Sequence, residues 1–174
     1  MYYSAFLQKV EKAVDLLLKA ERPMIMAGGG VHISGAFQEL QALAEMLMIP
    51  VVTTFKGKGA FPENHPLALG PIGMHGHAEA NKLIIESDVL LAIGARFSDR
   101  SVGKFEEFGQ NMKIIHIDID PAEIGKNKQV DVPVVGDVKA SLRALVKMLT
   151  KRIAKKDGES NWIKHINEVR EAMW

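Results

Sequence analysis

Residues 23–30 read Pro-Met-Ile-Met-Ala-Gly-Gly-Gly, and this stretch decides the fold. Its apolar part, residues 24–27, is short and stops at three glycines, which is the pattern of a buried strand followed by a turn. Apolar residues recur at helical spacing on both sides of it, over residues 6–18 and 37–47. A short buried strand between two amphipathic helices indicates an α/β fold.

The same alternation of strand-like and helical segments continues along the chain to about residue 150. Strands that are apolar throughout and alternate with helices form parallel sheets that are covered on both faces. We therefore expect an α/β fold with a doubly wound, mainly parallel, Rossmann-like sheet and helices on both faces. Further strands are expected at residues 49–54, 89–93, 113–118 and 130–135, helices at 78–86, 119–125 and 138–149, and a Gly- and Pro-rich loop at 56–76.

The chain divides into a domain at residues 1–152 and a segment at residues 153–174. Residues 151–159 are charged and contain one glycine, as is typical of a linker, and apolar residues at helical spacing follow from Trp162 to Met173. This final helix either docks on its own domain or leads into a further one. We expect a nucleotide-binding domain followed by a linker and a helix that leads to a domain outside this sequence.

Composition excludes several classes of function. The 174 residues include 22 Lys and Arg and 21 Asp and Glu, so the formal net charge is +1. A net charge this small gives the chain no overall attraction for nucleic acid or for an anionic membrane. There is no cysteine, which excludes disulfides, thiolate metal sites and cysteine nucleophiles. No apolar run approaches about 20 residues, and the N-terminus does not resemble a secretory signal. We expect a soluble, cytoplasmic protein.

Glycines follow several of the expected strands. Gly28, Gly29 and Gly30 follow the first strand, Gly94 follows the strand at 89–93, and Gly136 follows the last. Ligands of open α/β sheets bind at these carboxyl ends, and glycine lets backbone N–H groups approach a phosphate. The glycines therefore predict a nucleotide-sized ligand, or they are there only because the turns require them.

The sequence does not fit a standard NAD-binding fingerprint. The pattern G-x-G-x-x-G, counted from Gly28, would need a glycine at Ile33. The acidic residue that binds ribose at the end of the second strand is replaced by Thr53 and Thr54.

Charged residues at the strand ends are candidate ligand contacts. Arg96 and Arg100 flank Asp99, and a guanidinium matches a phosphate, although a surface salt bridge with Asp99 is the alternative. Asp118 is better placed for a ribose, whereas Asp120 fits the cap of a short helix. The Asp after Gly136, Asp137, suits either role.

No catalytic group emerges from the residues. His75 and His77 lie in a Gly-rich loop without carboxylates at ligand spacing, so we expect no metal site. The other four histidines are scattered, and no serine lies in the context of a nucleophile. The residues therefore predict that this domain binds a ligand, and they indicate no catalytic side chain.

An ordered series of motifs runs along the chain. These motifs are residues 94–100 (GARFSDR), 115–127 (IHIDIDPAEIGKN) and 135–137 (VGD), supported by 23–30, 56–59 and 73–76. Together they resemble the central domain of thiamine-diphosphate-dependent enzymes, specifically of the catalytic large subunit of acetolactate synthase, over about residues 5–155. Ser98 departs from the pattern, because the family often has a second acidic residue there.

The resemblance implies that this domain binds FAD across the strand ends in a non-redox role. The adenosine end of FAD would approach Asp118, Ile119, Gly136 and Asp137. The implied FAD-binding residues are Gly28, Gly29, Gly30, Thr54, Gly73, Met74, His75, Gly76, Gly94, Ala95, Arg96, Asp99, Arg100, Asp118, Ile119, Gly136 and Asp137.

The resemblance also implies a larger enzyme. Thiamine diphosphate and Mg²⁺ would be bound by N- and C-terminal domains of the same subunit, which would form a homodimer or tetramer with a regulatory small subunit. That enzyme condenses pyruvate with a second 2-oxo acid in branched-chain amino-acid biosynthesis, and the present chain alone would be inactive. The alternative is a sister decarboxylase or carboligase whose central domain binds ADP or is a purely structural module.

Overall fold

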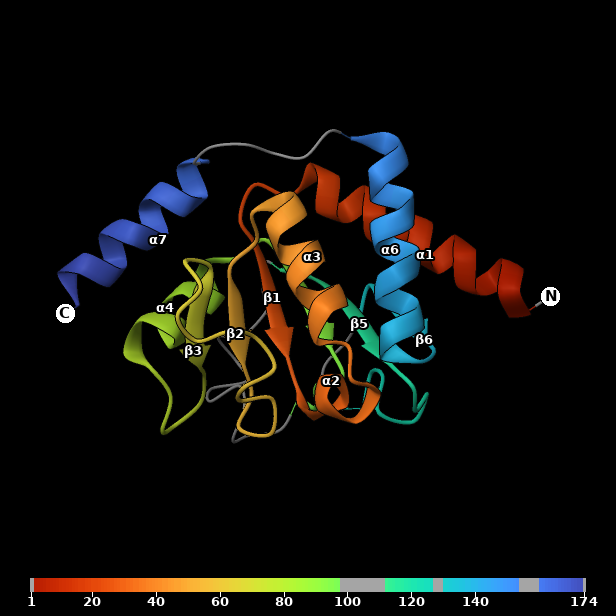
Figure 1. Ribbon diagram of the computed structural model, residues 1–174, viewed down its shortest axis with the longest axis horizontal. Coiled ribbons are helices and arrows are strands. Elements are labelled where there is room, and N and C mark those ends of the chain that lie inside the picture. Colours follow the sequence, from red (N-terminus) through yellow and green to blue (C-terminus); the bar gives the residue numbers. More distant parts are fainter. Residues whose placement is uncertain (1, 98–111, 127–129, 154–159, 174) are drawn as a thin grey trace.

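The computed structural model describes residues 2–97, 112–126, 130–153 and 160–173. Its centre is a six-stranded sheet in the order β3-β2-β1-β4-β5-β6, in which every neighbouring pair is parallel (Figure 1). The strands are β1 (Pro23–Ala27), β2 (Val51–Thr53), β3 (Ala68–Pro71), β4 (Val89–Ile93), β5 (Lys113–Asp118) and β6 (Val132–Val135).

Helices flank this sheet, as expected for a doubly wound fold. In Figure 1, α3 and α6 lie side by side across one face, with α1 packed against α6. The connection from β1 to β2 and the connection from β3 to β4 run in opposite directions, so right-handed crossovers put α3 and α4 on opposite faces. The helices are α1 (Tyr2–Lys19), α2 (Gly29–Ser34), α3 (Phe37–Leu47), α4 (Ala78–Glu86), α6 (Val138–Arg152) and α7 (Asn161–Ala172).

The strand order reverses in the middle of the sheet. The chain starts at β1, works outward to β3, and then returns to β4 on the other side of β1. In sheets of this order, a dinucleotide binds where the order reverses, at the carboxyl ends of the two central strands. Here these ends are paired through Ala27 and Ile93.

The core forms where the central strands meet the covering helices. Met24, Ile25 and Met26 of β1 are fully buried, as is every residue of β4 from Leu90 to Ile93. Each large apolar side chain of this kind contributes roughly 1.5–3 kcal/mol by leaving water. Among the described helices, none is both long enough and apolar enough to cross a membrane.

Two expectations for the local structure were wrong. The loop expected at residues 56–76 contains β3, whose Gly70 and Pro71 suggested a turn, but a strand at the edge of a sheet tolerates proline. The short helix expected at 119–125 is a series of turns. There Asp120 Oδ1 accepts a hydrogen bond from the Ala122 backbone N–H at 2.9 Å, which stabilises a turn instead of capping a helix.

The final helix, α7, docks on the domain. Trp162 Nε1 donates a hydrogen bond to the Pro23 carbonyl at 2.8 Å, and His165 Nε2 lies 2.8 Å from Glu86 Oε2 of α4. Arg170 donates to the Pro66 carbonyl at 3.0 Å. Of the two alternatives for this segment, docking is confirmed, and its continuation into a further domain stays a prediction.

One histidine lies inside this core. His116 of β5 has no solvent exposure, and its Nε2 lies 2.8 Å from the Ala95 carbonyl oxygen. Burial lowers the pKa of His116, because a charged imidazolium loses its hydration there; the Ala95 carbonyl and the charges of Asp118 and Glu123 oppose this shift only in part. The imidazole is therefore neutral in the folded protein.

We expect replacement of Trp162 by Ala to destabilise the protein by about 3 kcal/mol, because a large buried side chain and its hydrogen bond are lost. For a domain of this size, the melting temperature should fall by about 6–12 °C, measured by circular dichroism. Lys164→Ala, on the exposed face of the same helix, is the control and should change little. An unchanged melting temperature in Trp162→Ala would contradict the docking of α7.

We also expect the protein to lose stability as the pH falls below 6.5, the ordinary pKa of His116. The unfolded chain takes up a proton on this imidazole near that pH, while the folded protein does so only at lower pH, so protons favour unfolding. The slope is at most about 1.4 kcal/mol per pH unit.

Urea unfolding between pH 7.5 and 5.5 would measure this effect. His116→Gln removes the titrating group and should flatten the profile, whereas His75→Gln, at an exposed position, should keep the wild-type slope. Equal slopes in wild type and His116→Gln would show that His116 titrates normally.

Candidate functional site

The residues predicted to bind a ligand gather at the carboxyl ends of the strands. Because all strands are parallel, these ends form one edge of the sheet, which we call the carboxyl edge. Asp99 and Arg100 lie outside the described residues. The structure places Asp118 as the last residue of β5 and the others in the segments that follow β1 (Gly28, Gly29, Gly30), β2 (Thr54), β3 (Gly73, Met74, His75, Gly76), β4 (Gly94, Ala95, Arg96), β5 (Ile119) and β6 (Gly136, Asp137).

The glycines after β1 and β4 pack against each other. A Cβ on Gly94 would lie 2.6 Å from the Gly30 Cα, and a Cβ on Gly28 would collide with the Gly94 carbonyl. The Gly28 N–H donates to the Ile93 carbonyl and the Gly30 N–H to the Gly94 carbonyl, both at 2.9 Å. Close approach of two turns therefore explains these three glycines, and the N–H groups of Gly28 and Gly30 already have acceptors.

The segment after β2 brings a lysine and an exposed aromatic residue to the same place. The Thr54 N–H donates to the Ala27 carbonyl at 3.0 Å, and Thr54 Oγ1 accepts from the Gly57 N–H at 3.2 Å. A Cβ on Gly29 would lie 3.2 Å from the Lys56 Cβ, so Lys56 follows β2 directly beside the turn after β1. Phe55 is 88% exposed.

The loop after β3 is anchored to α4 by a residue that the sequence did not mark. The Gly73 N–H donates to Asn81 Oδ1, and Asn81 Nδ2 donates to the Gly73 carbonyl, both at 2.8 Å. The Gly76 N–H closes the loop on the Gly73 carbonyl at 3.0 Å. This anchoring leaves Met74 87% exposed and His75 exposed. No pattern in the sequence distinguishes Asn81 from any other helical asparagine.

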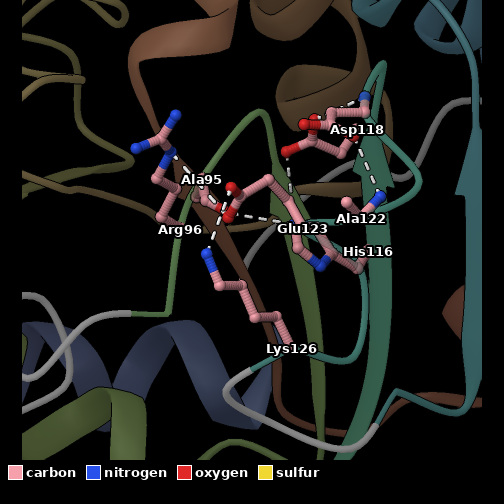
Figure 2. Close-up of polar contacts among 8 residues, drawn as sticks. Ala95, Arg96, His116, Asp118, Ala122, Glu123 and Lys126 are labelled. Atoms are coloured by element: carbon pink, nitrogen blue, oxygen red, sulfur yellow. Dashed lines mark hydrogen bonds and ion pairs between the residues drawn. The ribbon is translucent and has the colours of Figure 1, made fainter.

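Arg96 is an accessible cation of the carboxyl edge. Its side chain is 68% exposed, and its Nε lies 3.9 Å from Glu123 Oε2. Lys126 Nζ lies 3.8 Å from the other oxygen of Glu123, so the carboxylate lies between two cations (Figure 2). Ion pairs of this length and exposure are weak, so the guanidinium can donate to an anionic ligand.

Asp118 lies at the end of β5 with one oxygen engaged. Its Oδ1 accepts from the Asp120 N–H at 2.9 Å, and its Oδ2 lies 3.7 Å from His116 Nε2 (Figure 2). A carboxylate has about four acceptor sites, so Asp118 retains capacity for a hydroxyl donor. The next residue, Ile119, is 67% exposed.

Asp137 caps a helix. Its Oδ2 accepts from the Ala140 N–H at 2.8 Å, at the first turn of α6. The capping interpretation is therefore confirmed, and a ligand contact of Asp137 stays a prediction. The Gly136 N–H donates to the Asp118 carbonyl at 3.0 Å, which joins the ends of β5 and β6.

His116 supports this edge from inside the sheet. The sequence motifs do not predict this role, although His116 is a polar residue between Ile115 and Ile117 in an otherwise apolar stretch, which is a sign of a specific buried contact. Within the described ranges, no three His, Asp or Glu side chains come together as a metal-binding group.

Known proteins resemble this chain closely. The family described as "Thiamine pyrophosphate enzyme, central domain" matches residues 10–145. A "Probable acetolactate synthase large subunit" of Methanococcus aeolicus is 52% identical over 172 residues, which are 95% of this chain and 29% of the relative. The protein of the same name from Methanocaldococcus jannaschii is 55% identical over 162 residues, 93% of this chain and 27% of the relative.

More distant organisms have similar proteins. The "Acetolactate synthase large subunit" of Parasynechococcus marenigrum is 45% identical over 158 residues, 91% of this chain and 25% of the relative. The chain thus spans between a quarter and three tenths of the length of these relatives. Since the family match covers most of the chain and the parallel sheet, the chain belongs to the family of thiamine pyrophosphate enzyme central domains.

Proposed function

We propose that this chain is the central domain of an acetolactate synthase large subunit and that it binds FAD in a non-redox role. The intact enzyme would condense pyruvate with a second 2-oxo acid in branched-chain amino-acid biosynthesis. The names of three relatives with 45–55% identity support the assignment to an acetolactate synthase large subunit. The distribution of side chains along the carboxyl edge supports FAD as the ligand.

The observation that supports FAD as the ligand is that the side chains along this edge change from apolar to cationic and then to acidic. The segments after β2 and β3 expose Phe55 and Met74, and the segment after β4 exposes the cation Arg96. The ends of β5 and β6 instead carry the carboxylates Asp118, the last residue of β5, and Asp137, which follows β6. A ligand that fits this order has a flat apolar ring at one end, an anionic group in the middle and a ribose toward the other end.

FAD has these three parts in this order, so the residues present fit it. Arg96 would hold the pyrophosphate, with Lys56 close to the same turn. Asp118 would accept hydrogen bonds from the ribose of the adenosine. Phe55 and Met74 would cover the isoalloxazine. Bound FAD would complete the packing of the subunit around the site and would not exchange electrons in the overall carboligation.

The rest of the enzyme would lie outside this chain. Decarboxylation of pyruvate and formation of the new carbon–carbon bond are the chemistry that thiamine diphosphate supplies with Mg²⁺. A carboxylate of an N-terminal domain would activate the aminopyrimidine of thiamine diphosphate, and a G-D-G…N motif of a C-terminal domain would hold Mg²⁺ and the pyrophosphate. The subunit would act in the cytoplasm as a homodimer or tetramer with a regulatory small subunit.

One observation favours a second candidate, a central domain that binds ADP or has only a structural role. The N–H groups of Gly28 and Gly30 are already hydrogen-bonded, and one carboxylate oxygen of Asp137 is engaged as a helix cap. The two N–H groups cannot donate to a dinucleotide without breaking those bonds. A ligand would therefore depend on side chains, above all on Arg96.

Titration with FAD tests the proposal. We expect binding that quenches flavin fluorescence, and a weakening of about tenfold or more in Arg96→Ala, because a hydrogen bond to a charged group is worth about 1.5–3 kcal/mol. Arg143→Ala is the matched control, since this arginine is equally exposed but pairs with Glu39 on the helical face. Its affinity for FAD should equal that of wild type.

A parallel titration with ADP separates the two candidates. Binding of ADP without binding of FAD would contradict the FAD proposal and favour the sister enzymes. Equal affinity for FAD in wild type and Arg96→Ala would show that Arg96 does not contact the ligand.

We expect no acetolactate from pyruvate when this purified chain is incubated with thiamine diphosphate and Mg²⁺. The reason is that the chain has no G-D-G…N motif and spans less than a third of its relatives. A colorimetric acetoin assay, with an intact acetolactate synthase as positive control, measures the product. Formation of acetolactate above the no-protein blank would refute the assignment as one domain of the enzyme.

A further inference from the structure

The side chain of His116 makes a hydrogen bond to a residue that is not its pairing partner in the sheet. In the sheet, His116 is paired with Ala92 of β4. Its side chain instead reaches the Ala95 carbonyl, at 2.8 Å, where the chain has already left β4 (Figure 2). The imidazole thus extends along the sheet to the turn that carries Arg96.

The Ala95 carbonyl depends on this contact. Ala95 is 1% exposed, and none of the described backbone N–H groups outside the regular helices and strands donates to its oxygen. A buried carbonyl without a partner costs about 1–3 kcal/mol. Loss of the imidazole would therefore favour another conformation of this turn.

The other neighbour of Arg96 contacts the same imidazole. The ring of Phe97 is 4% exposed and meets the His116 ring edge to face, at 5.2 Å between centroids and 90° between planes. Arg96 itself is exposed, but the residues before and after it are both buried against His116. The backbone on both sides of Arg96 is therefore held from inside the core.

The hydrogen bond also defines the state of the imidazole. A carbonyl only accepts, so Nε2 carries the proton, and the low pKa of His116 keeps the ring neutral. Nδ1 is then a buried acceptor with no partner among the described residues. An apolar side chain at this core position would bury no nitrogen without a hydrogen-bond partner. The specific contribution of the imidazole is therefore the hydrogen bond that Nε2 donates.

We propose that His116 is a positioning residue, whose Nε2–H holds the Ala95 carbonyl so that Arg96 meets an anion at the carboxyl edge. The ligand part of this inference rests on the proposed function, because it takes FAD as the anion. The part that concerns the turn is independent of any ligand.

Two amide variants test the proposal with matched chemistry, and neither introduces a group that titrates. In His116→Gln the amide N–H₂ reaches about as far as Nε2 and can donate to the Ala95 carbonyl. In His116→Asn the amide ends nearer the position of Nδ1 and cannot reach that carbonyl. We expect affinity for FAD within about threefold of wild type for His116→Gln and a loss of about tenfold for His116→Asn, which is about 1.4 kcal/mol.

Amide resonances of Ala95, Arg96 and Phe97 give a readout that needs no ligand. Both variants lose the ring current of the imidazole, but only His116→Asn loses the hydrogen bond, so these resonances should shift further from the wild-type positions in His116→Asn than in His116→Gln. The titrations use only variants with a wild-type circular dichroism spectrum. If wild type does not bind FAD, the proposed function fails, while these resonances still decide the positioning role. Equal shifts in the two variants, or wild-type affinity in His116→Asn, would overturn it.

The wild-type protein provides a test that does not depend on the folding of a variant. A long-range ¹H–¹⁵N spectrum of the histidine rings should show His116 neutral and protonated at Nε2 at pH 7. A proton at Nδ1 would overturn the proposal, because the ring could then not donate to the Ala95 carbonyl.

Discussion

The contact between the turns after β1 and β4 is the constraint on which the rest of this structure depends. At the point where the strand order reverses, Gly28 and Gly30 touch Gly94 closely enough that no side chain could stand between them. The turn at Gly94 has a φ of 56°, which also favours glycine. Because these two strands are the centre of the sheet, the position of every other strand end follows from this contact.

The same contact extends across the sheet as a row of hydrogen bonds. Beyond five of the six strands, the next N–H donates to the last or nearly last carbonyl of a neighbouring strand: Thr54 to Ala27, Gly28 to Ile93, Gly94 to Ile117, Gly136 to Asp118 and Ile72 to Thr53. These N–H groups are therefore not available to a ligand. The proposed binding of FAD at the carboxyl edge would depend instead on side chains and on the remaining backbone groups.

Buried and half-buried side chains hold the backbone beside exposed residues of the carboxyl edge. Arg96 is at the surface, but Ala95 and Phe97 on either side of it are buried against His116. In the same way, Asn81 of α4 holds the loop that exposes Met74. Both supports are buried or half-buried polar side chains, and each fixes a loop that regular secondary structure leaves free.

The sequence by itself determined the fold class and most of the elements, because buried strands and amphipathic helices have strong and different periodicities. It also identified the carboxyl edge, since parallel strands bring their ends together. It failed at β3 and at residues 119–125, where glycine, proline and aspartate favour turns locally and only the neighbouring strand or a side-chain hydrogen bond decides the outcome. The tertiary structure alone decided that three glycines face each other, that Asp137 caps a helix, and that His116 supports Ala95. Each of these contacts depends on how close two segments or groups lie in space, and a local sequence pattern does not predict that distance.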